Sequence, residues 1–298
     1  MDAERYMSST RHAEVPPTPK RTVLVVDPDP QIGVMLSSIL TPLGWTMEVA
    51  QDNKAVLSLV EAGLFDLIIT GEKTSAREDV ELLQEIRRVH PHTRMVILTD
   101  DSTPADVITS MREHAFGYFS KPFSLESLAE TVRMVTDGPC WDDGIEVLSA
   151  TPTLISLAVR CEVRTADRLL QFLSEMADLP EREKREVGTA FREMLLNAIE
   201  HGGRFDPEQY IEITYIRARK MVMGRIKDPG EGFSLDEIQH AAIANPPEDP
   251  MQHLARREAL GLRPGGFGVL MARHLVDELI YGEKGNEVLL VKYLPQDG

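Results

Sequence analysis

The sequence predicts two consecutive folded units, a parallel α/β unit followed by an α+β unit. In the first half, short continuous apolar runs alternate with helical patterns, which is the order of βαβ units around a parallel sheet. In the second half, strand-like runs surround a few amphipathic helical patterns, so we expect helices on one face of a mixed sheet. The length of 298 residues also suggests about two domains.

Composition limits the function classes. The formal net charge of −16 argues against a general nucleic-acid surface and against an anionic-membrane surface. No apolar run approaches the length of a membrane span, and the N-terminus lacks the apolar centre of a signal peptide. Cys140 and Cys161 have no metal-ligand spacing and fit reduced thiols. We therefore expect a cytoplasmic protein.

The first unit follows a tail. Residues 1–21 mix Ser, Thr, charges and prolines without periodicity, so we expect them to be flexible. The strand-like runs that follow are 22–27, 65–70, 94–99 and 117–121. The helical patterns between and after them are about 31–43, 53–62, 79–90, 104–114 and 124–137. In such a sheet, function sits at the carboxyl ends of the strands, which here carry Asp27, Asp29, Thr99, Asp100 and Lys121.

These strand ends resemble the receiver domain of two-component response regulators. The resemblance rests on Val25-Val-Asp-Pro-Asp-Pro30, Leu98-Thr-Asp100 and Gly117-Tyr-Phe-Ser-Lys-Pro-Phe123, and it covers about residues 20–138. It implies a five-stranded flavodoxin-like fold in which acidic residues after the first strand hold Mg²⁺. It also implies a phosphorylated aspartate after the third strand, with Thr99 and Lys121 in the positions that contact the phosphoryl group.

The resemblance breaks at the phosphoacceptor. Residues 66–71 match the third strand of the family, and the acceptor position falls on Gly71, which has no oxygen nucleophile. Pro28 takes the second of the paired acidic positions and weakens the metal site. A shift of one residue would offer Glu72, but the family spacing argues against it. We therefore expect a pseudo-receiver over residues 22–138, with Lys121 paired to Asp27 and a role in dimerisation or partner docking.

A short linker and a second unit follow. Residues 139–150 are rich in turn formers, which predicts the linker, and the second unit covers residues 151–298. Its strand-like runs are 153–159, 210–216, 220–227 and 286–293. Its helical patterns are about 165–177, 181–201 and 268–278. A short polar break separates the two middle runs, so we expect them to pair antiparallel.

One helix of the second unit carries a polar stripe. A spacing of four residues places Glu193, Asn197 and His201 on one side of it. The core-facing positions are Val187, Phe191, Met194, Leu195 and Ala198. Gly202 and Gly203 then end the helix. Taken alone, this stripe fits the polar edge of an ordinary amphipathic helix.

Two glycine motifs favour a nucleotide site instead. Asp228-Pro-Gly-Glu-Gly-Phe233 directly follows a strand, and Arg263-Pro-Gly-Gly-Phe-Gly268 directly precedes a helix. A glycine-rich loop that leads into a helix binds anions, because its backbone N–H groups and the helix dipole favour phosphate. A carboxylate can accept a hydrogen bond from the amino group of adenine. An amide oxygen suits Mg²⁺. Each signal alone is weak, since the first motif is more often a surface turn.

Together the three motifs resemble the N, G1 and G2 boxes of the GHKL ATPase superfamily, over about residues 150–298. That superfamily has an α+β ATP-binding fold, the Bergerat fold, and includes gyrase, histidine kinases and anti-sigma-factor serine kinases. The resemblance implies ATP and Mg²⁺ as cofactors, with Asn197 on the metal, Glu193 as catalytic carboxylate and Asp228 on the adenine amino group.

The same resemblance assigns the glycines. Gly230 and Gly232 would shape the adenine pocket, and residues 234–264 would form a mobile lid. The residues that would close over the phosphates are Gly265, Gly266 and Gly268. His201 matches the end of the N box, where it has either a nucleotide-binding role or a role in packing at the helix end.

Within the superfamily, the chain looks most like the anti-sigma-factor serine kinases. No histidine lies between His114 and His201, which disfavours a histidine kinase. We expect an ATP-dependent serine/threonine kinase that acts on a protein partner, an anti-sigma antagonist or a sigma factor, under control of the pseudo-receiver. Both resemblances are compatible with a homodimer. The alternative is an ATP-gated module that sequesters its partner without catalysis. The acidic charge and the lack of a helix-turn-helix pattern disfavour a DNA-binding regulator.

Overall fold

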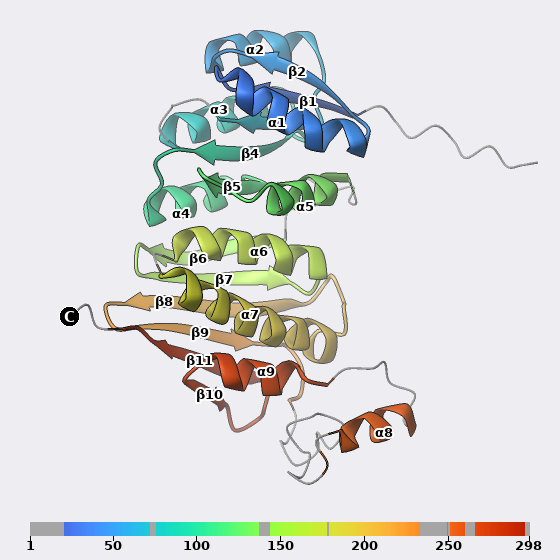
Figure 1. Ribbon diagram of the computed structural model, residues 1–298, viewed down its shortest axis with the longest axis vertical. Coiled ribbons are helices and arrows are strands. Elements are labelled where there is room, and N and C mark those ends of the chain that lie inside the picture. The colour runs from blue at the N-terminus through green and yellow to red at the C-terminus, as the bar shows by residue number, and fades with distance from the viewer. Residues whose placement is uncertain are drawn as a thin grey trace, which may run out of the picture.

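The computed structural model describes residues 21–71, 76–136, 144–177, 179–232, 249, 251–259 and 266–295. Two sheets with their helices follow one another along the long axis of the molecule (Figure 1). The strands of the first sheet are β1 Arg21–Val26, β2 Trp45–Ala50, β3 Leu67–Thr70, β4 Arg94–Thr99 and β5 Gly117–Ser120. They are parallel in the order β2-β1-β3-β4-β5, which confirms the predicted flavodoxin-like sheet.

Helices cover both faces of this sheet, and the central strands are therefore continuously buried. They are α1 Pro30–Leu40, the short 3₁₀ helix Thr41–Leu43, α2 Asn53–Ala62, α3 Ala76–Val89, α4 Pro104–Arg112 and α5 Leu125–Thr136. Edge strand β2 was not predicted from the sequence. Only Trp45 and Ala50 of its residues are buried, so it has no continuous apolar run. β1 begins at Arg21, inside the predicted tail, and residues 1–20 lie outside the described residues.

The second sheet is antiparallel throughout the described residues, so the prediction of a mixed sheet was wrong. Its strands are β6 Ile145–Thr151, β7 Leu154–Arg160, β8 Tyr210–Ala218, β9 Met221–Lys227, β10 Glu278–Tyr281 and β11 Glu287–Tyr293. Their order is β10-β11-β9-β8-β7-β6. β6 occupies the end of the predicted linker, since alternation resumes at Ile145 and lets this segment pair with β7.

Three helices lie on one face of this sheet (Figure 1). They are α6 Val163–Met176, α7 Glu181–Asn197 and α9 Gly268–Leu275. A fourth, α8 Gln252–Ala259, lies away from the sheet. Four of the five predicted core-facing residues, Phe191, Met194, Leu195 and Ala198, are buried, and Val187 is partly buried against the same cluster. No helix within the described ranges combines the length and apolar character that a membrane crossing requires.

Helix α6 joins the two sheets through the free edge of β5. Arg168 Nε donates to Phe116 O at 3.0 Å. Gln171 accepts from Tyr118 N at 3.2 Å and donates to Tyr118 O. Because alternate residues of a strand direct their backbone groups to the same side, these bonds satisfy the edge of β5 that would otherwise lie open.

The last rung of this ladder lies one turn further along α6. Glu175 Oε2 accepts from Ser120 N at 3.2 Å and also from the Ser120 hydroxyl. Arg168, Gln171 and Glu175 are spaced i, i+3 and i+7, so they form one stripe on α6. The helix therefore takes the place that a sixth strand would have beside β5.

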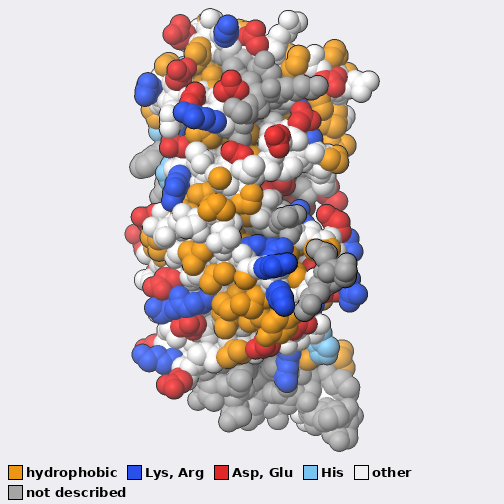
Figure 2. Space-filling model, turned by 90° about the vertical axis from the view of Figure 1, so that its left-hand side faces the viewer, with side chains coloured by type: hydrophobic (Ala, Val, Ile, Leu, Met, Phe, Trp, Pro, Cys, Tyr) orange, Lys and Arg blue, Asp and Glu red, His pale blue; other side chains and the backbone are white. Residues whose placement is uncertain are grey.

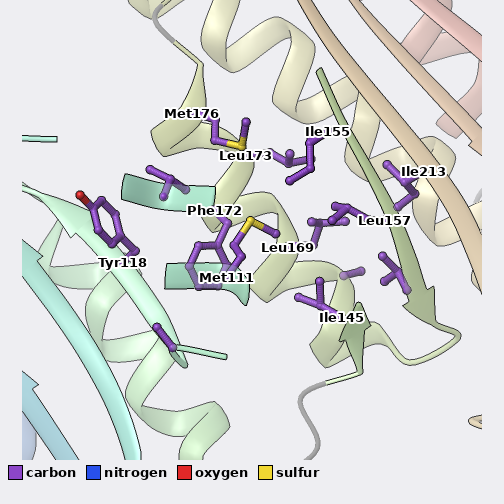
Figure 3. Packing of buried hydrophobic residues seen from close by; sticks show 14 of the residues in the cluster. Met111, Tyr118, Ile145, Ile155, Leu157, Leu169, Phe172, Leu173, Met176 and Ile213 are labelled. Carbon is purple, nitrogen blue, oxygen red and sulfur yellow. The ribbon is translucent and has the colours of Figure 1, made fainter. Parts of the chain in front are cut away.

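Apolar packing continues across the same junction. Figure 3 shows Met111 and Tyr118 of the first unit beside Leu169 and Phe172 of α6, and all four belong to one buried cluster that extends into the second sheet. Arg168 is only 4% exposed and lies 4.3 Å from the centre of the Phe116 ring. Burial of a large apolar side chain is worth about 1.5–3 kcal/mol. The apolar cluster that the two units share therefore holds them together.

Surface ion pairs add little to the stability of the second sheet. On the side drawn in Figure 2, both acidic and basic side chains appear on the surface, and hydrophobic ones occur in the upper and the lower half. Arg225 Nε lies 2.7 Å from Glu287 Oε1 on the neighbouring strand, but both side chains are about a third exposed. Exposed pairs of this type add about 0–1 kcal/mol each. The apolar junction therefore outweighs them.

The shared core predicts one unfolding transition. Phe172→Ala should lower the free energy of unfolding by about 3–5 kcal/mol, because it leaves a cavity between the two units. Urea unfolding followed by circular dichroism measures this change. Val163→Ala on the same helix is the matched control, since Val163 is 40% exposed and its truncation should shift stability by less than about 0.5 kcal/mol. Two separate transitions, with only one of them shifted by Phe172→Ala, would contradict the shared core.

Candidate functional site

The end of α7 departs from a regular helix. After Asn197 the chain continues as a π-helical turn over Ala198–Gly202, closed by a 2.8 Å bond from Gly203 N to Ala198 O. The wider turn takes His201 off the stripe that four-residue spacing predicted. Glu193 and Asn197 are half-buried, whereas His201 is exposed. π turns of this kind are frequent at functional sites.

Glu193 and Asn197 face the first turn of α9. A Cβ atom on Gly268 would lie 2.7 Å from Glu193 Oε2 and 3.7 Å from Asn197 Nδ2. A helix N-terminus carries backbone N–H groups without intrahelical partners, and the side chain of the N-cap residue Phe267 makes no capping bond. The two predicted polar groups therefore lie beside a terminus suited to anions.

Asp228 follows β9 and packs against the π turn. Its Oδ1 accepts from Gly230 N at 2.8 Å. A Cβ on Gly202 would lie 2.2 Å from Asp228 Cγ, so the loop and the turn are in direct contact. Burial raises the pKa of the Asp228 carboxyl, and the bond from Gly230 together with the nearby His201 partly opposes that rise. The carboxylate is thus partly shielded from water.

Cys161 lies behind this contact. A Cβ on Gly203 would lie 2.2 Å from Cys161 Sγ. The thiol is buried and unpaired with another cysteine, and burial raises its pKa to about 11. Such a thiol is protonated and unreactive at neutral pH. Cys161 therefore packs the rear of the site and carries no chemistry.

A turn between β10 and β11 forms a further wall that the motifs did not indicate. Gly232 has φ of +85°, and a Cβ there would lie 1.7 Å from Lys284 O. Only glycine fits a left-handed position so close to another backbone segment. The loop 228–232 therefore lies directly on the turn 282–286.

The structure describes only some of the remaining predicted site residues. Gly266 has φ of +89° just before α9. Gly265 lies outside the described residues, and of the predicted lid 234–264 only 249 and 251–259 are described. The structure thus brings Glu193 and Asn197 to Gly268, and His201 to the loop of Asp228, Gly230 and Gly232.

The strand ends of the first sheet form a second polar cluster. Lys121 Nζ donates to Gly71 O at 2.7 Å and to Asp27 Oδ2 at 3.1 Å, and it lies 3.6 Å from Asp100 Oδ2. The expected pair of Lys121 with Asp27 is therefore present, and Asp27 is only 6% exposed. A Cβ on Gly71 would lie 2.3 Å from Asp27 Oδ2, so the Asp27 carboxylate occupies the space beside this glycine.

Two other residues of this cluster form hydrogen bonds with backbone groups that are close in sequence. Asp29 Oδ1 accepts from Gln31 N at 2.8 Å and caps α1, while Asp29 N donates to Asp27 Oδ1. The Thr99 hydroxyl donates to Asp101 O at 2.8 Å. The cluster is thus satisfied by contacts among its own residues.

Comparison with known families agrees with both motif sets. Residues 23–133 match the model of the response regulator receiver domain, and residues 157–292 match that of the histidine kinase-like ATPase domain. The DNA-binding transcriptional regulator NtrC of Azospirillum brasilense is 28% identical over 112 residues, which cover 38% of this chain and 23% of that protein. The response regulator MprA of Mycolicibacterium vanbaalenii is 27% identical over 148 residues, covering 49% and 64%. The chain thus spans less than two thirds of each relative.

Solved structures of similar proteins cover the receiver part. A response regulator from Thermotoga maritima is 24% identical with a TM-score of 0.37, over 40% of this chain and 99% of that one. The Vibrio cholerae chemotaxis protein CheY4 is 27% identical with a TM-score of 0.35, over 39% and 98%.

The wall at Gly232 gives a direct test of the geometry. Gly232→Ala should destabilise the protein by about 1–3 kcal/mol, because the new methyl group meets the Lys284 carbonyl in a strained backbone conformation. Gly188→Ala in α7 is the matched control: a Cβ there meets nothing within 4 Å, and the change should stabilise by about 0.5–1 kcal/mol. Thermal unfolding measures both. Equal effects of the two substitutions would contradict the described loop.

Proposed function

We propose that this chain, which joins a response regulator receiver domain to a histidine kinase-like ATPase domain, is an ATP-dependent protein serine/threonine kinase in a signalling pathway. One observation carries the proposal: the N-terminus of α9 approaches a carboxylate and an amide on α7, Glu193 and Asn197. This combination offers N–H groups to phosphate, a hard oxygen to a metal and a base to a hydroxyl.

In the proposed complex each predicted residue has one task. The Asp228 carboxylate accepts from the adenine amino group, and Gly230 and Gly232 let the backbone approach the base. Gly265, Gly266 and Gly268 would close over the phosphates. Asn197 would hold Mg²⁺ through its amide oxygen, because an oxygen donor fits a hard cation. When bound, Mg²⁺ neutralises charge on the phosphate oxygens. His201 is exposed at the edge of the loop and partly opposes the rise in the pKa of Asp228.

The proposed reaction transfers the γ-phosphoryl group to a partner serine. A bond forms between the serine oxygen and the γ-phosphorus, and the bond between that phosphorus and the oxygen bridging to the β-phosphate breaks, which releases ADP. Glu193 accepts the proton of the serine hydroxyl. Because burial raises the pKa of Asp228, ATP affinity should be lost as the pH falls through that raised value, at a higher pH than for an exposed aspartate.

The proposed partner is a protein, an anti-sigma antagonist or a sigma factor, and the proposed location is the cytoplasm. One relative, NtrC, is a DNA-binding transcriptional regulator, but the match covers only 23% of that protein. The net charge of −16 disfavours a nucleic-acid partner for this chain and disfavours an anionic membrane. A homodimer is compatible with this proposal.

We further propose that the receiver domain controls the kinase without being phosphorylated itself. Gly71 offers no nucleophile, and Asp27 with Lys121 already fills the space beside it. Control would pass through α6, which bonds β5 on one side. Asp167, which is also on α6, pairs with Arg192 at 3.1 Å, next to Glu193 on α7. A change in β5 would thus reach the catalytic helix through one rigid element.

The decisive experiment incubates the protein with labelled ATP, Mg²⁺ and candidate antagonist proteins, and identifies the labelled residue. We expect phosphoserine or phosphothreonine on the partner. Glu193→Gln should retain ATP but slow transfer by about 10²–10⁴-fold, the usual contribution of a general base. Asn197→Ala should weaken Mg-ATP binding.

Thr189→Ala is the control for both, because Thr189 is exposed on the same helix. Nucleotide binding without transfer to any partner would select the ATP-gated sequestering module. Absence of ATP binding would contradict the proposed kinase function.

Control through α6 has its own test. Glu175→Ala should break the rung to Ser120 and change the rate of phosphoryl transfer several-fold, as coupling free energies of about 1 kcal/mol imply. Acetyl phosphate should neither label the receiver nor alter the rate. Glu130→Ala, on the exposed side of α5, is the control. Stable labelling of residues 23–133, or a Glu175→Ala rate equal to that of the control, would contradict this mode of regulation.

A further inference from the structure

Asn286 joins the proposed adenine loop to the turn between β10 and β11. Its side-chain Nδ2 donates to Asp228 O at 3.2 Å and to Gly230 O at 3.3 Å. Its backbone oxygen accepts from Asp228 N at 2.9 Å. Both side-chain contacts are carbonyl oxygens, so the NH₂ group must face the loop. One residue therefore makes three bonds to the segment 228–230.

These bonds act on the backbone that carries the Asp228 carboxylate. The carbonyl oxygens of Asp228 and Gly230, on either side of Pro229, both accept from Asn286. Gly230 N in turn donates to Asp228 Oδ1 at 2.8 Å. On the opposite side, the π turn packs against Asp228. Rotation of the carboxylate would require one of these contacts to break. Asn286 itself is half-buried and lies behind the loop.

We propose that Asn286 is a positioning residue that sets the preference of this site for adenine over guanine, an inference that rests on the proposed ATP site. Asp228 accepts from the exocyclic amine of adenine, whereas guanine presents a carbonyl oxygen there and is repelled. Such discrimination is strong only if the carboxylate cannot move away from the wrong base. Asn286 supplies that restraint.

A purely structural role makes a different prediction. If Asn286 only stabilises the fold, its loss lowers ATP and GTP affinity by the same factor, together with the melting temperature. If it positions Asp228, its loss weakens ATP binding while GTP binding is unchanged or improves. The ratio of the two affinities therefore separates the two roles.

The test measures ATP and GTP dissociation constants, with Mg²⁺, for the full chain and its variants by calorimetry. Asn286→Asp keeps the shape but turns an oxygen toward two carbonyls, and ATP affinity should fall roughly tenfold or more, as expected for two lost hydrogen bonds. The ATP-to-GTP preference should fall with it. Asn286→Ser, which retains one donor, should give an intermediate preference. Thr189→Ala, the exposed control on α7, should match the wild type.

Failure of the inference is distinguishable from failure of the proposed function. Wild-type protein that prefers ATP, with an Asn286→Asp variant of equal preference, overturns the positioning role and leaves the ATP site intact. An equal fall in both affinities does the same. Wild-type protein that binds neither nucleotide overturns the ATP site and the inference together.

Discussion

The side-chain ladder from α6 to β5 is the contact on which the arrangement of the whole molecule depends. Arg168, Gln171 and Glu175 satisfy the backbone groups of an edge strand, and Phe172 continues the same core into the next sheet. An open strand edge would invite pairing with another chain. Here the neighbouring domain closes it. The receiver is therefore a packed part of the molecule, and α6 belongs to both halves.

The candidate site follows from that placement. α6 packs beside α7, and α7 presents Glu193 and Asn197 to the first turn of α9, while its π turn contacts Asp228. Glycines occur where these segments meet, because a side chain at Gly202 or Gly268 would occupy the space of the polar groups. The chemistry thus depends on close backbone approach. The receiver cluster shows the reverse case, with Asp27 and Lys121 satisfied by each other.

Sequence patterns predicted the features that are local. Periodicity located α7, and continuous apolar runs located the buried strands β1, β3 and β4. Features that depend on distant partners were missed: β2 is a half-exposed edge strand, and β6 becomes a strand only by pairing with β7. The hydrogen bonds of Asn286 were missed too, because its partners lie more than fifty residues away. The bonds of α6 to β5 were missed likewise, because the spacing of the polar side chains on α6 does not identify their partner strand.

The central claim is that ATP binds between α7, the loop 228–232 and the N-terminus of α9. Its most direct test is a crystal structure of the full chain with Mg²⁺ and a non-hydrolysable ATP analogue. The account predicts the adenine amino group within hydrogen-bonding distance of the Asp228 carboxylate, with the phosphates at the start of α9 beside Glu193 and Asn197. An analogue bound elsewhere, or adenine turned away from Asp228, would contradict the account.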